Sequence, residues 1–91
     1  MRVRINVTKT DIKKGVRTDC EHCPVARAVL RALKPCGYKF VVVGSNDVDF
    51  GVDNPDEANR VLPAAAVKWI KAFDESVSKS QNAPFSFNIN L

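Results

Sequence analysis

The stretch from Thr18 to Cys36, T-D-C-E-H-C-P-V-A-R-A-V-L-R-A-L-K-P-C, decides the fold, because it contains the clearest helix and all three cysteines. Pro24 suits the first position of a helix, where its missing N–H costs nothing and its φ is already helical. Cys23 would then be the N-cap, since a residue before proline is disfavoured in the α conformation. An alternative start lies one turn earlier, because Thr18 and Glu21 have the spacing of a capping box.

The predicted helix is amphipathic and ends at Pro35. Its apolar residues recur at helical spacing on one side and are expected to face the core. Arg27, Arg31 and Lys34 fall at i, i+4 and i+7 on the other side, which predicts a basic face in water. A basic face favours an acidic partner, so these three residues are candidate partner-binding residues.

The chain of 91 residues is long enough for a single domain, residues 1–91, with a modest core. Residues 1–39 hold ten Lys/Arg and three Asp/Glu, a net +7, whereas residues 40–91 hold four and seven, a net −3. No apolar run approaches the roughly 20 residues of a membrane span, and residues 1–4 show no secretory signal. Three cysteines fit poorly with a secreted disulfide scaffold, so we expect a cytoplasmic protein with reduced thiols.

Sequence periodicity predicts four strands and a second helix. The strands are expected at residues 2–8, 38–43, 48–53 and 84–91, with the middle two joined as a hairpin. The second helix is expected over Pro63–Val77, with a buried stripe of Ala66, Trp69, Ile70, Phe73 and Val77. Residues 54–61 are expected to form a loop or a helical turn. This order predicts an α+β fold, namely a ferredoxin-like β-α-β-β-α-β arrangement with a four-stranded, mainly antiparallel sheet and two helices on one face.

The segment Cys20-Glu21-His22-Cys23 is a C-x-x-C at a helix start, where free N–H groups and the helix dipole stabilise a thiolate. It resembles the active-site motif of thioredoxin-like oxidoreductases, which implies an alternative function as a thiol–disulfide redox protein using Cys20 and Cys23. In that family the strand ends directly at the motif, whereas residues 11–19 intervene here. The competing interpretation is that the cysteines are small packing residues.

Metal binding, nucleic-acid binding and catalysis are disfavoured. Cys36 lies about 19 Å along the helix from Cys23 at 1.5 Å per residue, too far to share a zinc ion unless the helix is broken or a second subunit supplies Cys36. Asp49 and Asp53 on the predicted sheet would repel phosphate, so direct nucleic-acid binding would have to use the basic helix face. His22 is the only histidine, and no phosphate-binding loop or paired-carboxylate pattern is evident. We therefore expect no metal, no cofactor and no enzymatic activity.

The strand predicted at residues 38–43 is unusual, because Phe40 to Val43 are apolar on both faces. In the ferredoxin-like order this strand lies at an edge, and an apolar edge with free backbone groups is a template for pairing with another chain. We therefore expect strand pairing here, in a homodimer or with a partner, and Val42 is a candidate partner-binding residue.

Four segments carry a resemblance: I-N-V-T-K-T-D-I-K-K-G (residues 5–15), D-C-E-H-C-P-V-A-R-A-V (19–29), W-I-K-A-F-D (69–74) and P-F-S-F-N-I (84–89). Together they resemble small uncharacterised bacteriophage and prophage proteins with a D-C-x-x-C-P-V-A motif. The resemblance implies the cytoplasm of a bacterial host. Small phage proteins of this kind often bind and block host machinery, and by this analogy we expect a non-enzymatic binding module that docks on a host protein or ribonucleoprotein complex and inhibits or modulates it, for example as an anti-CRISPR protein against a CRISPR-Cas defence system.

Overall fold

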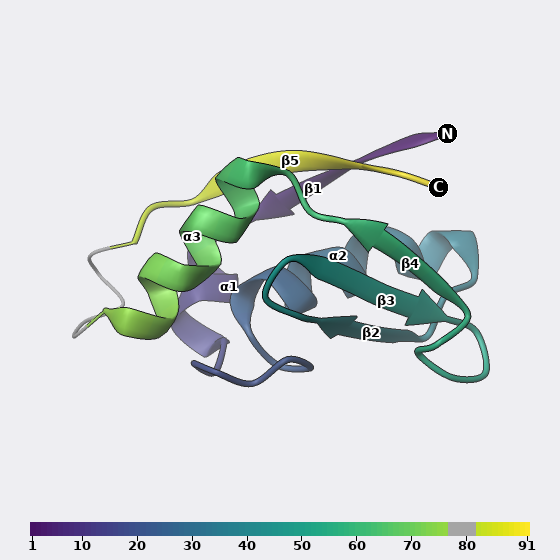
Figure 1. Ribbon diagram of the computed structural model, residues 1–91, viewed down its shortest axis with the longest axis horizontal. Coiled ribbons are helices and arrows are strands. Elements are labelled where there is room, and N and C mark those ends of the chain that lie inside the picture. The colour runs from purple at the N-terminus through teal and green to yellow at the C-terminus, as the bar shows by residue number, and fades with distance from the viewer. Residues whose placement is uncertain (77–81) are drawn as a thin grey trace.

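The computed structural model describes residues 1–76 and 82–91, and it contains two antiparallel sheets (Figure 1). The strands are β1 (Arg2–Val7), β2 (Phe40–Val43), β3 (Asp47–Gly51), β4 (Ala58–Val61) and β5 (Phe85–Asn90). The smaller sheet pairs β1 with β5, and the larger sheet has the order β2-β3-β4. Both chain ends lie together, because the Leu91 N–H donates to the Met1 carbonyl at 2.8 Å.

The helices are α1 (Lys9–Lys14), α2 (Pro24–Leu33), the short 3-10 helix η1 (Lys34–Cys36) and α3 (Ala64–Glu75). Figure 1 shows α2 behind the larger sheet and α3 beside the end of that sheet where β2 turns into β3. Helix α2 contacts both β1 and β2 and so joins the two sheets, with Val25, Val29 and Leu33 completely buried. Among residues 1–76 and 82–91, no helix has the length and apolar character needed to cross a membrane.

The predicted start of the first main helix is confirmed at Pro24. Cys23 is its N-cap, and the Cys23 Sγ accepts a hydrogen bond from the Ala26 N–H at 3.4 Å. The alternative start at Thr18 is wrong, because Thr18 has a φ of 57° in the left-handed region and the chain does not become helical there. The regular helix ends at Leu33, one turn before Gly37, whose φ of 95° is typical of glycine after a helix.

The predicted four-stranded ferredoxin-like sheet with two helices is wrong. Residues 1–76 and 82–91 contain five strands in two sheets and three α-helices. A ferredoxin-like sheet would place β1 beside β3, but β4 occupies that edge, from Asp47 opposite Val61 to Phe50 opposite Ala58. Because β3 has a neighbour on each side, β1 pairs with β5 in a sheet of its own. The predicted hairpin of β2 and β3 is confirmed.

The loop before β4 explains why this strand forms where a loop or helical turn was expected. The Glu57 carboxylate accepts hydrogen bonds from the backbone N–H groups of residues 52–54, at 2.7 to 3.2 Å. Gly51 permits the tight return, since the Asn54 carbonyl oxygen occupies the place where a Cβ would lie. The chain therefore turns back directly along β3, and Leu62 enters the core just after β4.

Helix α3 closes the core against the start of β5. Ala66 and Phe73 are buried and Trp69 and Ile70 are half-buried, as the predicted stripe requires, whereas Val77 lies outside the described residues. The Trp69 indole N–H donates to the Ala83 carbonyl at 2.8 Å, and its ring stacks on Phe85 with centroids 4.9 Å apart. These contacts fasten the smaller sheet to α3.

Candidate functional site

The C-x-x-C segment holds one buried and one exposed thiol. Cys23 is 6% exposed, as expected for a packing residue, and its side chain is used as the cap of α2. Burial raises the pKa of the Cys23 thiol, and the backbone N–H groups of Ala26 and Val25 offset this only in part. The thiol is therefore protonated at neutral pH, which disfavours the thiol–disulfide alternative because the thiolate is the reactive form.

The other two cysteines lie at opposite ends of α2, and both are exposed. Cys20 lies in the loop before the helix, where its carbonyl accepts the Val43 N–H at 2.7 Å. Cys36 lies in η1, beyond the end of α2. Within residues 1–76 and 82–91, no group of three or more His, Cys, Asp or Glu residues is arranged to hold a metal ion.

The predicted basic face of α2 lies over a buried carboxylate. Arg31 binds Asp11 in a bidentate pair, with N–O distances of 2.8 and 2.7 Å, and also donates to the Asn6 carbonyl at 2.8 Å. The Arg27 Nε lies 3.5 Å from the same carboxylate. Lys34 is exposed at the end of the helix, beside a shallow hollow of about 270 Å³. Two of the three candidate residues, Arg27 and Arg31, are therefore paired with a carboxylate inside the fold.

Asp11 is the residue that the sequence analysis missed. It is completely buried, and it forms a capping box with Thr8 at the start of α1. Burial alone would raise the pKa of the Asp11 carboxyl, but hydrogen bonds from Arg31 and Thr8 outweigh it and hold the pKa below its usual value. The Thr8-x-x-Asp11 spacing is a visible cap signal, although nothing in it indicates that Arg31 would be the partner.

Val42 lies on the outer side of the larger sheet, where it is half-buried. Backbone N–H groups alternate in direction along a strand. Because the Val43 N–H points away from β3 to Cys20, Val41 has the other outward N–H of β2. Strand pairing at this edge stays a prediction, and in this geometry it would have to displace the Cys20 carbonyl or use Val41 alone.

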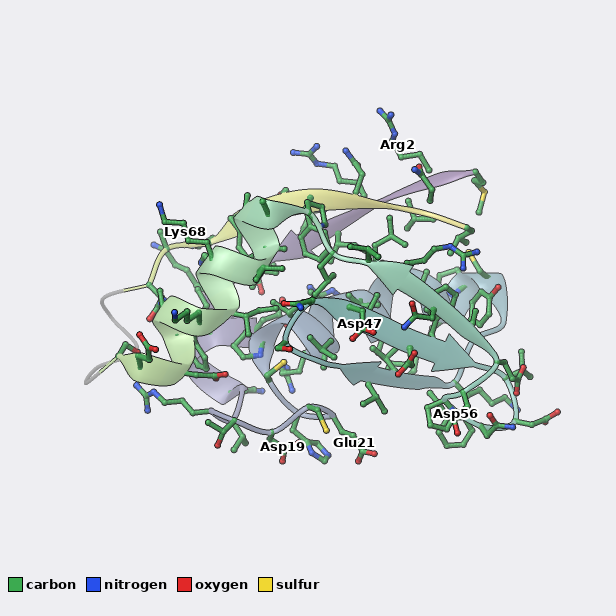
Figure 2. The ribbon with its side chains drawn as sticks, in the orientation of Figure 1. Arg2, Asp19, Glu21, Asp47, Asp56 and Lys68 are labelled. Carbon is green, nitrogen blue, oxygen red and sulfur yellow. The ribbon has the colours of Figure 1, made fainter. Side chains whose placement is uncertain are left out.

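The outer side of the larger sheet is the most distinctive surface of the molecule, and we call it the sheet face. It consists of Phe40, Val42, Asp47, Asp49, Asn59 and Val61, which the strand register places on one side. Figure 1 shows this sheet in front of α2, with no other described element over it, and Figure 2 marks Asp47 on it.

Two features of the sheet face stand out. Phe40 and Val61, on the two edge strands, are 43% and 81% exposed. Between them, the Asn59 side-chain amide donates to both Asp47 and Asp49, at 3.0 and 2.7 Å, and fixes the two carboxylates beside each other. The arrangement can bind a surface with apolar groups around a cation.

Comparisons with protein-family models, with curated proteins and with solved structures find no match to this chain. The resemblance to phage proteins therefore stays a prediction. Function has to be inferred from the surfaces of the molecule itself, chiefly from the sheet face.

Proposed function

We propose that the protein is a small non-enzymatic binding module that docks on a host protein or ribonucleoprotein complex through the sheet face and inhibits or modulates it. The observation that supports this proposal is the exposed apolar pair, Phe40 and Val61, on either side of two fixed carboxylates. Isolated exposed apolar residues are ordinary on protein surfaces. Here they share one uncovered sheet with Val42, which is typical of an interaction surface.

The energetics favour protein binding at this face. Covering an exposed Phe or Val side chain contributes up to about 1.5–3 kcal/mol, and Phe40 and Val61 both have much of this still to gain. The carboxylates of Asp47 and Asp49 add selectivity, because a partner without a matching cation would leave them desolvated and unpaired. The preferred partner surface is therefore apolar with Lys or Arg at its centre.

The charge around the face points to a basic partner. Residues 40–61 contain five Asp/Glu and one Lys/Arg, a net −4, whereas residues 1–39 carry +7. Basic surfaces are characteristic of proteins that bind nucleic acid, which is consistent with a ribonucleoprotein complex as the host target. The phage resemblance gives the proposed setting, the cytoplasm of a bacterial host, and a defence complex such as CRISPR-Cas is the proposed kind of target.

Variants of the sheet face test this function in a pull-down from host lysate, with captured proteins identified by mass spectrometry. Phe40→Ser and Val61→Ser should each lose the captured partner, because they remove apolar contact area. Val16→Ser is the matched control, since Val16 is 50% exposed but lies outside the face.

Charge reversal provides the second arm of the same experiment. Asp49→Lys should abolish capture, whereas Asp56→Lys, which makes the same change in net charge in the loop before β4, should not (Figure 2). Undiminished capture by the three face variants, each shown to fold by circular dichroism, would refute docking through this face.

A further inference from the structure

A groove runs between α3 and the turn that joins β2 to β3. It consists of two cavities of about 290 and 460 Å³, which share Ser45, Ile70 and Asp74 in their walls. The loop of residues 18–20 closes one end of the smaller cavity. Three segments that are far apart in the sequence therefore line two adjoining cavities, and Figure 1 shows two of these segments, α3 and the β2–β3 turn, facing each other.

The floor of the groove is apolar. Cys23 and Val43, both buried, lie beneath the smaller cavity, and Val67 and Ile70, both half-buried, line the larger one. Solvated aliphatic side chains at the bottom of a groove favour an apolar occupant, because covering them removes their surface from water.

The rim of the groove is acidic. Asp19, Asp74 and Glu75 line it, with Lys71 as the one cationic side chain among the lining residues. The Asp74 carboxylate accepts the Thr18 N–H at 3.0 Å, which fills one of its roughly four acceptor positions and fixes it at the edge. Charge complementarity therefore calls for an occupant that carries positive charge beside its apolar group.

The wall opposite α3 suits a polypeptide backbone. Ser45 and Asn46 are exposed in the β2–β3 turn, and their hydroxyl and amide groups can both donate and accept hydrogen bonds. An extended peptide needs such partners along its length, whereas a compact organic cation does not.

We propose that this groove binds an extended, cationic segment of another protein, with an aliphatic side chain seated on Val67 and Ile70 and a Lys or Arg paired with Asp74 and Glu75. The inference does not depend on the sheet face. One partner could contact both the groove and the sheet face, but a variant can lose binding at one of them and keep binding at the other.

The test uses the full chain and a defined synthetic probe, the capped heptapeptide Ser-Gly-Lys-Ile-Lys-Gly-Ser, followed by backbone amide NMR. Millimolar peptide should shift the amides of residues 43–46 and 67–75. The matched peptide with Glu in place of both Lys should not bind. High salt should weaken binding of the Lys peptide, because the rim pairs are solvent-exposed.

Isosteric variants separate charge from shape. The double variant Asp74→Asn with Glu75→Gln keeps an acceptor for the Thr18 N–H and should bind the Lys peptide about threefold more weakly, the effect of two exposed ion pairs. The control, Asp53→Asn with Asp56→Asn, makes the same change in net charge at the loop before β4 and should bind as the wild type does.

The cysteines supply an internal footprint. Cys20 lines the groove and Cys36 does not, and both are exposed. Bound peptide should slow alkylation of Cys20 and leave Cys36 unchanged. Any of three results would overturn the proposal: equal binding of the Lys and Glu peptides, no shifts at residues 67–75, or equal slowing at both cysteines. None of these results would alter the pull-down with sheet-face variants, so the two proposals fail separately.

Discussion

The two sheets are both antiparallel, but their outer surfaces differ in chemistry. On the smaller sheet the outward side chains are all polar and exposed, namely Arg2, Arg4, Asn6, Ser86, Asn88 and Asn90. On the larger sheet the outward side includes Phe40, Val42 and Val61 around two aspartates. Figure 2 shows the contrast at Arg2, which points away from the body, and Asp47, on the uncovered sheet.

The outer surface of the smaller sheet follows the usual alternation of inward apolar and outward polar residues, and the outer surface of the larger sheet does not. A sheet with one buried side normally alternates apolar residues inward and polar residues outward, and β1 and β5 do so without exception on their outer side. The larger sheet buries Val48 and Phe50 equally well but leaves apolar groups outside too. Because exposed apolar groups add nothing to this core, the larger sheet is the better candidate for binding.

The largest expected effect concerns how the smaller sheet is attached. Arg31 links the buried Asp11 to the carbonyl of Asn6 in β1, so Asp11→Asn removes the charge that holds this junction. Unfolding in urea should show a loss of about 2 kcal/mol, because the variant removes the charge from a bidentate pair whose carboxylate is completely buried while its arginine is half exposed. Lys34→Met, on the same helix but exposed, should change stability by under about 0.5 kcal/mol.

Hydrogen exchange sharpens this prediction. The Asp11→Asn variant should lose protection in β1 and β5 before β2 and β3, because the lost contacts reach Asn6 but not the larger sheet. Equal loss in both sheets would mean that the molecule opens as one unit. The two sheets would then differ in their outer surfaces but not in their local stability.

The same carboxylate predicts the acid side of the stability profile. The folded-state pKa of Asp11 is held below its ordinary value of 3.8, so its contribution is complete above that pH and is lost as the pH falls toward the folded pKa. The pKa values of Asp19 and Glu57 are lowered as well, mainly by backbone hydrogen bonds, and they add to the loss in the wild type. The difference between wild type and Asp11→Asn, measured in urea from pH 6 downward, should therefore shrink below about pH 4. A constant difference would contradict the assigned role of Asp11.

Much of the local structure follows from periodicity and proline placement. The strands at β1 and β5 alternate over six residues, and Cys23-Pro24 marks the start of α2. By contrast, β4 is only Ala58–Val61, whose sequence does not alternate between apolar and polar residues, and it forms because Glu57 fixes the loop before it. The sequence does not predict β4, so the predicted fold places β1 at the second edge of β3 and has one sheet where the structure has two.

The candidate site was predictable only in part. The spacing of Arg27, Arg31 and Lys34 places them on one side of a helix, but spacing cannot show that Asp11, from a different helix, lies beneath the two arginines. The sequence does show that Phe40 and Val42 are apolar residues on the face of their strand where polar residues are expected. The sequence does not place Val61 on this face, because it does not predict the strand that contains Val61. The sheet face therefore cannot be assembled from the sequence.

The smallest expected effect concerns Arg60, a side chain of β4 that bonds directly to the smaller sheet. Its Nε donates to the Asn90 carbonyl at 2.7 Å, and its guanidinium lies 5.6 Å from the centre of the Phe50 ring. Arg60→Met keeps most of the apolar stem over Phe50 and removes the hydrogen bond and the charge. Global stability should fall by about 1 kcal/mol, the usual effect of one solvent-exposed, charge-assisted contact.

The local effect of Arg60→Met should be clearer than the global one. The Leu91 amide, which is bonded to Met1 at the end of the smaller sheet, should exchange faster, while the amides of β2 and β3 should not change. Arg4→Met is the control, since Arg4 lies on the solvated side of β1 and should alter neither quantity. Faster exchange of the β3 amides in Arg60→Met would contradict this prediction. It would mean that the two sheets open together at this end and that Arg60 stabilises Phe50 more than it stabilises β5.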